Sequence, residues 1–206
     1  MAAILGGLSI GQHLLSGADP PIGRMNLDTE GSVPTWFQAS MLLLAAGLTG
    51  LVGVARSRAS DRYARHWLMA AGILVFLSMD EALALHERLI DPLRDALGAS
   101  GIFYFAWVIP GAVVVVLFAS AYLGFLLSLP TRMQRLLIFA GGFYIAGGLG
   151  VEAADGAYAS AFGLDNLGYT LLTDFEEVME MAGLLVLIYA LLWFLSTLRV
   201  SIRFDA

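Results

Sequence analysis

The chain has 206 residues, of which 59% are hydrophobic and 14% are charged, and its net charge is −6. Soluble domains carry about 25% charged residues, so we expect an all-α, multi-pass membrane protein that forms a single integral membrane domain over residues 1–206. Cysteine and lysine are both absent, which excludes disulfides, thiolate metal sites and a Schiff-base lysine, and the acidic balance argues against nucleic acid.

Long apolar runs bounded by turn residues predict six transmembrane helices. A spanning helix needs roughly 17–25 apolar residues, so the first run is expected to be short or partly interfacial. Pro110 is expected to kink the fourth helix, and a stripe formed by Gly142, Ala146, Gly150 and Ala154 is expected to admit a neighbouring helix. The six predicted helices cover residues 1–15, 34–55, 67–89, 103–127, 136–154 and 167–198.

The arginines predict how the bundle is oriented in the membrane. Eight of the eleven lie in the loop after the second helix, the loop after the fourth helix and the C-terminal tail. In a six-helix protein these three places share one side, and the positive-inside rule makes that side cytoplasmic. We therefore expect a six-transmembrane-helix bundle with both termini inside (N-in/C-in), in the bacterial cytoplasmic (inner) membrane.

Acidic side chains inside or beside the apolar runs are the main functional signal. A charge within a bilayer costs at least a few kcal/mol and is rarely found there without a role. The predicted topology brings three acidic clusters into the outer half of the membrane, at the end of the third helix, the end of the fifth and the start of the sixth. Their members are Asp80, Glu81, His86 and Glu87; Glu152 and Asp155; and Asp174, Glu176, Glu177 and Glu180.

The first hypothesis for this layer is a metal site. Facing helices that project carboxylates and histidine inward build dinuclear metal centres in helical bundles, and hard oxygen ligands with one imidazole suit iron, manganese or zinc. A divalent metal ion here would make the protein a membrane metalloenzyme acting on a lipid or small apolar substrate, with Asp80 and His86 as catalytic residues. The expected metal ligands are Asp80, His86, Glu152, Glu177 and Glu180.

Two alternatives stay open at this stage. Clustered acids also carry protons or coordinate cations, which predicts a proton- or cation-coupled transporter, although the inner halves of the helices are almost wholly apolar. The acids can instead form a docking face, which predicts a non-catalytic subunit of a membrane complex. In each case the lipid bilayer is the first partner, and a homo-oligomer or a partner membrane subunit is the second.

Four short segments carry a family resemblance. They are L-D-x-E at residues 27–30, P-T-W at 34–36, D-E-A at 80–82 and H-E at 86–87. These pieces resemble those of a family of small bacterial multi-pass membrane proteins of unassigned function. The resemblance implies a polar outer layer toward which Asp28 and Glu30 fold back, and it implies no reaction.

Overall fold

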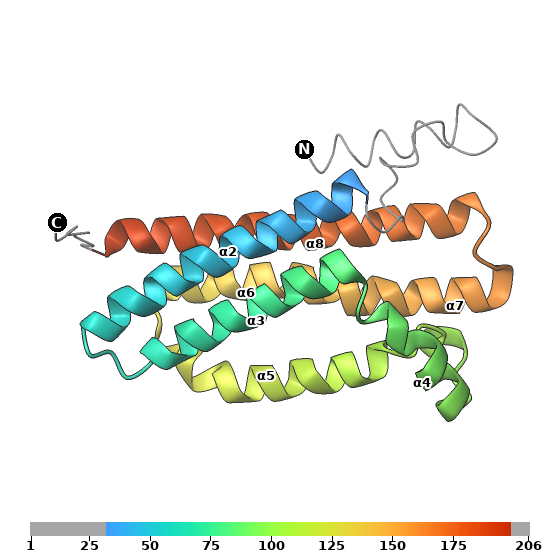
Figure 1. Cartoon of the computed structure of the whole chain (residues 1–206), viewed down its shortest axis with the longest axis horizontal. Coiled ribbons are helices and arrows are strands. Elements are labelled where there is room, and N and C mark those ends of the chain that lie inside the picture. The colour runs from blue at the N-terminus through green and yellow to red at the C-terminus, as the bar shows by residue number, and fades with distance from the viewer. Residues whose placement is uncertain (1–31, 199–206) are drawn as a thin grey trace.

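The computed structural model describes residues 32–198, which form an all-α fold of six helices, five of them long and apolar enough to cross a membrane (Figure 1). The all-α prediction is confirmed, and the predicted helix at residues 1–15 lies outside the described residues, as do Asp28 and Glu30. The long helices are α2 (Val33–Arg58), α3 (Ala64–Leu83), α5 (Val108–Ser128), α8 (Leu167–Thr197), and the continuous helix of α6 (Thr131–Ile145), η4 (Ala146–Val151) and α7 (Glu152–Phe162). The short elements are η2 (Glu87–Leu89), α4 (Ile90–Leu97) and η3 (Gly101–Phe103).

Side-chain caps fix where two of the long helices begin. The Ser32 hydroxyl accepts a hydrogen bond from the backbone N–H of Thr35 at 3.2 Å and starts α2. The Asn166 carbonyl oxygen accepts from the N–H of Tyr169 at 3.1 Å and starts α8. Such caps satisfy N–H groups that have no partner within the helix, and they agree with the predicted starts of both helices.

The third helix ends at Leu83, whereas the sequence predicted that it continues to residue 89. Ala84 adopts a left-handed conformation with φ of 48°, and its N–H bonds to the carbonyl oxygen of Asp80. The N–H of Leu85 reaches the same oxygen at 3.3 Å. His86 therefore lies in a turn after α3 rather than on a helix face.

Two other predicted boundaries differ from the structure. The fourth helix begins at Val108, so Pro110 lies in its first turn, where proline is tolerated and produces no kink. The fifth helix continues to Phe162, because no proline interrupts it before Gly163, whose φ of 80° ends it. Asp155 consequently lies inside a helix, 1% exposed, and not in a loop.

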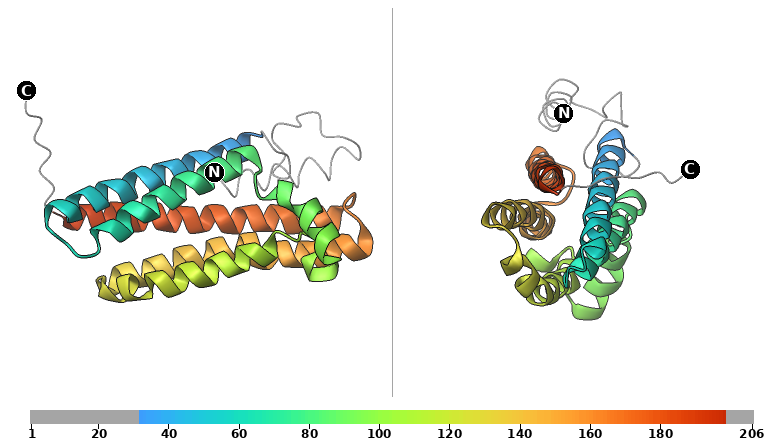
Figure 2. Two further views of the ribbon diagram at one scale, coloured as in Figure 1. Left: turned by 60° about the horizontal axis from the view of Figure 1, so that its bottom comes forward. Right: turned by 90° about the vertical axis from the view of Figure 1, so that its left-hand side faces the viewer.

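The long helices pack as two pairs with α5 alongside. In the end-on view of Figure 2, α2 and α3 lie on one side, α8 and the α6–α7 helix lie on the other, and α5 (yellow-green) lies below them. α2 bridges the two pairs by packing on both α3 and α8. A hydrogen bond of 3.1 Å from the Tyr122 hydroxyl of α5 to the His66 carbonyl oxygen ties α5 to α3.

A glycine contact brings α6 and α8 close together. A Cβ atom built on Gly183 would lie 2.7 Å from the carbonyl oxygen of Ala140 and 2.8 Å from the backbone nitrogen of Tyr144. The predicted small-residue stripe is not used among the described helices, since a Cβ on Gly142 or Gly150 would meet nothing within 4 Å. The π-helical η4 winds more widely than an α-helix, and it shifts which face of this helix meets α8.

The two ends of the bundle differ in charge. The α2–α3 connection, the α5–α6 connection and the end of α8 lie together at one end, which we call the basic end (Figure 1). The opposite end, called the acidic end, holds the turn after α3, α7 and the start of α8. Which of the two ends faces the cytoplasm stays a prediction. The arginines of the basic end are Arg56, Arg58, Arg62, Arg65, Arg132 and Arg135.

Candidate functional site

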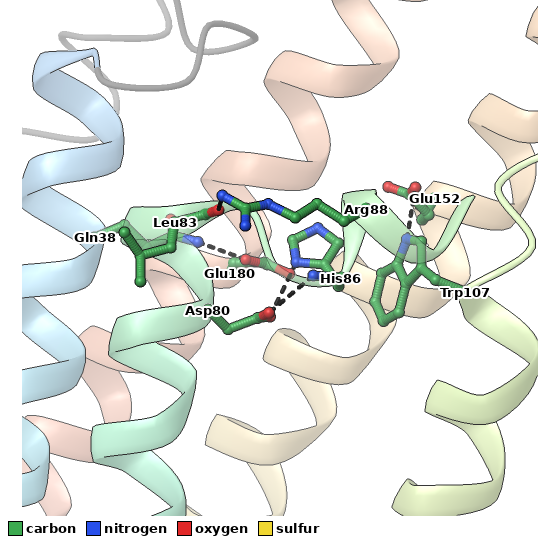
Figure 3. Close-up of polar contacts among 8 residues, drawn as sticks. All are labelled: Gln38, Asp80, Leu83, His86, Arg88, Trp107, Glu152 and Glu180. Carbon is green, nitrogen blue, oxygen red and sulfur yellow. Dashed lines mark hydrogen bonds and ion pairs between the residues drawn. The ribbon is translucent and has the colours of Figure 1, made fainter. Parts of the chain in front are cut away.

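The turn after α3 is held by the pairing of Asp80 with His86 (Figure 3). The Asp80 carboxylate accepts the backbone N–H of His86 through Oδ1 and the ring Nδ1–H through Oδ2, each at 2.9 Å. The imidazole also packs against the indole of Trp107, with ring centroids 4.7 Å apart. Asp80 therefore fixes both the chain direction after α3 and the orientation of the imidazole.

The charges around His86 favour its protonated form. Burial by itself lowers the pKa of His86, but the hydrogen bond and the charge of Asp80 act in the opposite direction. The carboxyl groups of Glu152 and Glu87 add to that effect, and the net result is a pKa raised to about 9. These charges favour an imidazolium at position 86 at neutral pH.

Trp107 connects this pair to the α6–α7 helix. Its indole Nε1–H donates to Oε1 of Glu152 at 3.0 Å (Figure 3). Glu152 is the first residue of α7 and directly follows the π-helical η4. Single π-helical turns inside α-helices occur frequently at functional sites, where the extra residue changes the direction of the side chains that follow.

The side chains of Glu152 and Glu176 of α8 also lie within hydrogen-bonding reach of each other. An ionised carboxylate only accepts hydrogen bonds, so this contact requires a proton on one of the two groups. Two carboxylates at such short range would otherwise repel each other strongly in a medium of low polarity. The pair is therefore a candidate position for a proton held between two helices.

Glu180 is enclosed one turn further along α8. Its Oε2 accepts a hydrogen bond from Nε2 of Gln38 at 2.5 Å, and Gln38 of α2 is 0% exposed (Figure 3). A Cβ on Gly148 would lie 2.1 Å from Oε1 of Glu180, and one on Gly147 would lie 2.9 Å from its Cγ. Only glycine at these two positions of η4 leaves room for the glutamate, so η4 and α2 together form its enclosure.

The remaining acids lie around this core. Asp155 of α7 and Asp174 of α8 are 1% and 3% exposed, and each of them has a further interaction, as does Glu177. Tyr144 of α6 lies within electrostatic reach of both Glu177 and Glu180. The acidic end therefore contains buried carboxyl groups as well as exposed ones.

The structure brings together four of the five predicted site residues, Asp80, His86, Glu152 and Glu180 (Figure 3), and places the fifth, Glu177, on α8 beside them. Among residues 32–198, however, no three His, Asp or Glu side chains are arranged to hold a metal ion. The physical reason is that each side chain has its own partner. Asp80 is paired with His86, Glu152 accepts from Trp107, and Glu180 accepts from Gln38. The divalent metal ion thus stays a prediction.

Three further residues belong to the site although the sequence did not single them out. Gln38 and Trp107 donate the hydrogen bonds that orient Glu180 and Glu152. Glu176 was predicted only as one member of the acidic cluster at the start of the sixth helix, and not as a site residue. Gln38 carried one usable signal, because it is an amide inside an otherwise apolar helix; Trp107 carried none, since aromatic residues are common near helix ends in membranes.

The long apolar helices and the polar cluster enclosed at one end are those of a multi-pass integral membrane protein. Residues 4–195 match the family model described as "Domain of unknown function (DUF8692)", and the chain belongs to this family. No curated protein and no solved structure matches the chain.

Proposed function

We propose that this membrane protein is a transporter that binds protons and passes them down a pH gradient through the buried carboxyl groups of its acidic end. The observation that carries the proposal is the close approach of Glu152 and Glu176 inside the bundle, because two carboxyl groups can form a hydrogen bond only when one of them holds a proton. Ionisable groups retained within membrane helices are commonly proton relays. The orientation with both termini in the cytoplasm of a bacterial cell belongs to the same proposal.

The other contacts of the site fit a relay in which each group has one task. His86, protonated and paired with Asp80, lies on the rim of the acidic end and is a group that can exchange protons with water. Trp107 does not release its indole proton, so it holds Glu152 in place rather than carrying charge. Glu180, enclosed by glycines, is the next carboxyl group beyond the Glu152–Glu176 pair.

The route continues from Glu180 toward the basic end through Tyr144. The backbone of Tyr144 packs against Gly183, which lies one turn along α8 from Glu180. A hydroxyl group both donates and accepts hydrogen bonds, so Tyr144 can extend the relay into the part of the bundle that the sequence presented as apolar.

A metalloenzyme is the second candidate, and the Asp80–His86 pair favours it. A carboxylate that accepts from Nδ1 and leaves Nε2 for another partner is the usual support of a metal-binding histidine. In that role the protein would be a membrane metalloenzyme with a divalent ion, acting on a lipid or small apolar substrate. The proton on His86 at neutral pH counts against it, since an imidazolium has no lone pair for a metal.

Proton flux into liposomes tests the proposal. The protein is reconstituted with a pH-sensitive dye inside the vesicles, and a pH gradient is imposed in the presence of an ionophore that removes the membrane potential. Glu176→Gln keeps the size of the side chain but ends proton exchange at this position, and we expect the flux to fall by about a hundredfold, a typical contribution of a positioned acid or base.

Asp165→Asn is the matched control, because it removes an exposed carboxylate from the same end of the bundle and should leave the flux unchanged. A wild-type flux equal to that of empty liposomes contradicts the proposal. Copurified metal in near-stoichiometric amount, lost in a Glu177→Ala, Glu180→Ala double variant, supports the metalloenzyme instead.

A further inference from the structure

Arg132 at the start of α6 is held in one position by aromatic residues of α8. Its Nη2 donates to the Tyr189 hydroxyl at 2.7 Å, and its guanidinium carbon lies 4.6 Å from the centre of the Trp193 ring. The arginine is nevertheless exposed. A guanidinium group has five N–H donors, so the bond to Tyr189 leaves most of them free for another partner.

No carboxylate of the described residues neutralises this arginine. Arg132 forms no ion pair within residues 32–198, and neither does Arg135, which is exposed one turn further on the same face of α6. Asp61, the single described acid of the basic end, is already paired with Arg56 at 3.4 Å. Two adjacent cations are thus presented outward without a counterion from residues 32–198.

The helix surface next to these cations is apolar. Phe139 continues the face of Arg132 and Arg135 along α6 and is 61% exposed. Leu185 lies one turn from Tyr189 on α8 and is 51% exposed. A ligand that fits both features carries a negative charge at the level of the arginines and hydrocarbon along the helices, which is the chemistry of an anionic phospholipid.

We propose that Arg132, Arg135, Tyr189 and Trp193 form a binding site for the headgroup of an anionic phospholipid, which we call the headgroup site. Arginine binds phosphate oxygens through two parallel hydrogen bonds, and tyrosine and tryptophan are enriched at the headgroup level of membranes. Basic pockets between transmembrane helices on the cytoplasmic side bind such lipids. The proton-transfer proposal and the headgroup site stand independently, since they share no residue.

Native mass spectrometry of the full chain in detergent tests this site by titration with phosphatidylglycerol or with phosphatidylcholine. We expect the wild type to bind phosphatidylglycerol more tightly. Arg132→Gln should weaken phosphatidylglycerol binding about fivefold and leave phosphatidylcholine binding unchanged, as expected for one arginine near a lipid surface. Arg135→Gln should act in the same direction, which keeps the test informative if Arg132→Gln does not fold.

Arg58→Gln is the control, because it makes the same change of charge at an exposed position of the same end. We expect less than a twofold effect from it. An equal loss in Arg58→Gln and Arg132→Gln overturns the headgroup site in favour of general attraction by the basic end. Displacement of the lipid by inorganic phosphate at equal concentration overturns it too, because the hydrocarbon would then contribute nothing.

Discussion

The acidic and the basic end of this bundle place their charges in opposite ways. The carboxyl groups of the acidic end lie between helices, where Gln38, Trp107 and His86 hold them. Five of the six arginines of the basic end are exposed, and among them Arg132 rests on the ring of Trp193. Burying a charge is costly unless it is paired or neutralised, whereas an exposed arginine keeps its hydration. Function is therefore expected at the acidic end, and orientation and lipid contact at the basic end.

The largest effect on stability is expected where the helices that carry the acids meet. Gly183→Ala places a methyl group 2.7 Å from a backbone oxygen of α6, and backbone cannot move aside as a flexible side chain can. We expect a loss of about 3 kcal/mol in the free energy of unfolding, at the upper end of the usual cost of overpacking. Unfolding of the purified protein in detergent measures it.

Gly142→Ala is the matched control, since its Cβ meets nothing within 4 Å. We expect it to be neutral or slightly stabilising, because alanine favours the helix more than glycine does. Equal losses in Gly142→Ala and Gly183→Ala would show that the close contact of α6 with α8 is not what holds the acidic end together.

The pairing of His86 makes stability depend on pH. Its pKa is raised from 6.5 to about 9, so the pair stabilises the fold fully below about pH 6.5, and this contribution is lost as the pH rises through about 9. We expect a loss of roughly 2–3 kcal/mol over this window, measured by unfolding at a series of pH values.

In Asp80→Asn the partner charge is gone, so the pH dependence in this window should largely disappear. Wild-type stability that stays constant between pH 6.5 and 9 contradicts the ion pair of the acidic end.

Gln38→Leu tests whether a neutral donor is needed inside the bundle. The change removes the N–H that bonds Glu180 and leaves the carboxyl group in an apolar enclosure, at an expected cost of about 2 kcal/mol. Ser40→Ala on the same helix is the control, because its hydroxyl only bonds the Trp36 carbonyl one turn back, and we expect it to change stability little. Equal stability of the Gln38→Leu variant and the wild type is the outcome that speaks against the enclosure.

The smallest effect is expected at the basic end. Arg58→Gln removes an exposed charge, and we expect a change within about 0.5 kcal/mol, as for most surface substitutions. The same unfolding assay measures it. A loss in the free energy of unfolding as large as that of Gln38→Leu would contradict this difference between the two ends. It would mean that the basic end also depends on its charges for stability.

Much of the fold follows from the sequence, and the exceptions have local causes. The bounds of α8 were predictable, because Asn166 caps the start of a long apolar run. The end of α3 was not, since no helix breaker stands before Pro92 and the stop comes from the carbonyl and carboxylate of Asp80 binding the following turn. The sequence also predicted that the fifth helix ends at residue 154. In the structure α7 continues to Phe162, because the alanine-rich sequence after Asp155 favours a helix.

The site was predictable in its acids but not in its partners. Topology and helix rise alone placed Asp80, Glu152 and Glu180 at one level, and the structure puts them at the same end of the bundle. Which donor each carboxyl group meets depends on the π-helical η4 and on contacts between helices far apart in the sequence. Periodicity carries no information on either, so the roles of Gln38 and Trp107 emerge only in three dimensions.

Infrared spectroscopy of the reconstituted protein tests the central claim most directly, because a protonated carboxyl group has a C=O stretching band separate from those of carboxylates. The account predicts such a band at neutral pH in the wild type, and a clear loss of its intensity in Glu176→Gln, in which the carboxyl pair no longer exists. Absence of the band in the wild type, or an unchanged band in Glu176→Gln, would contradict a proton shared between Glu152 and Glu176.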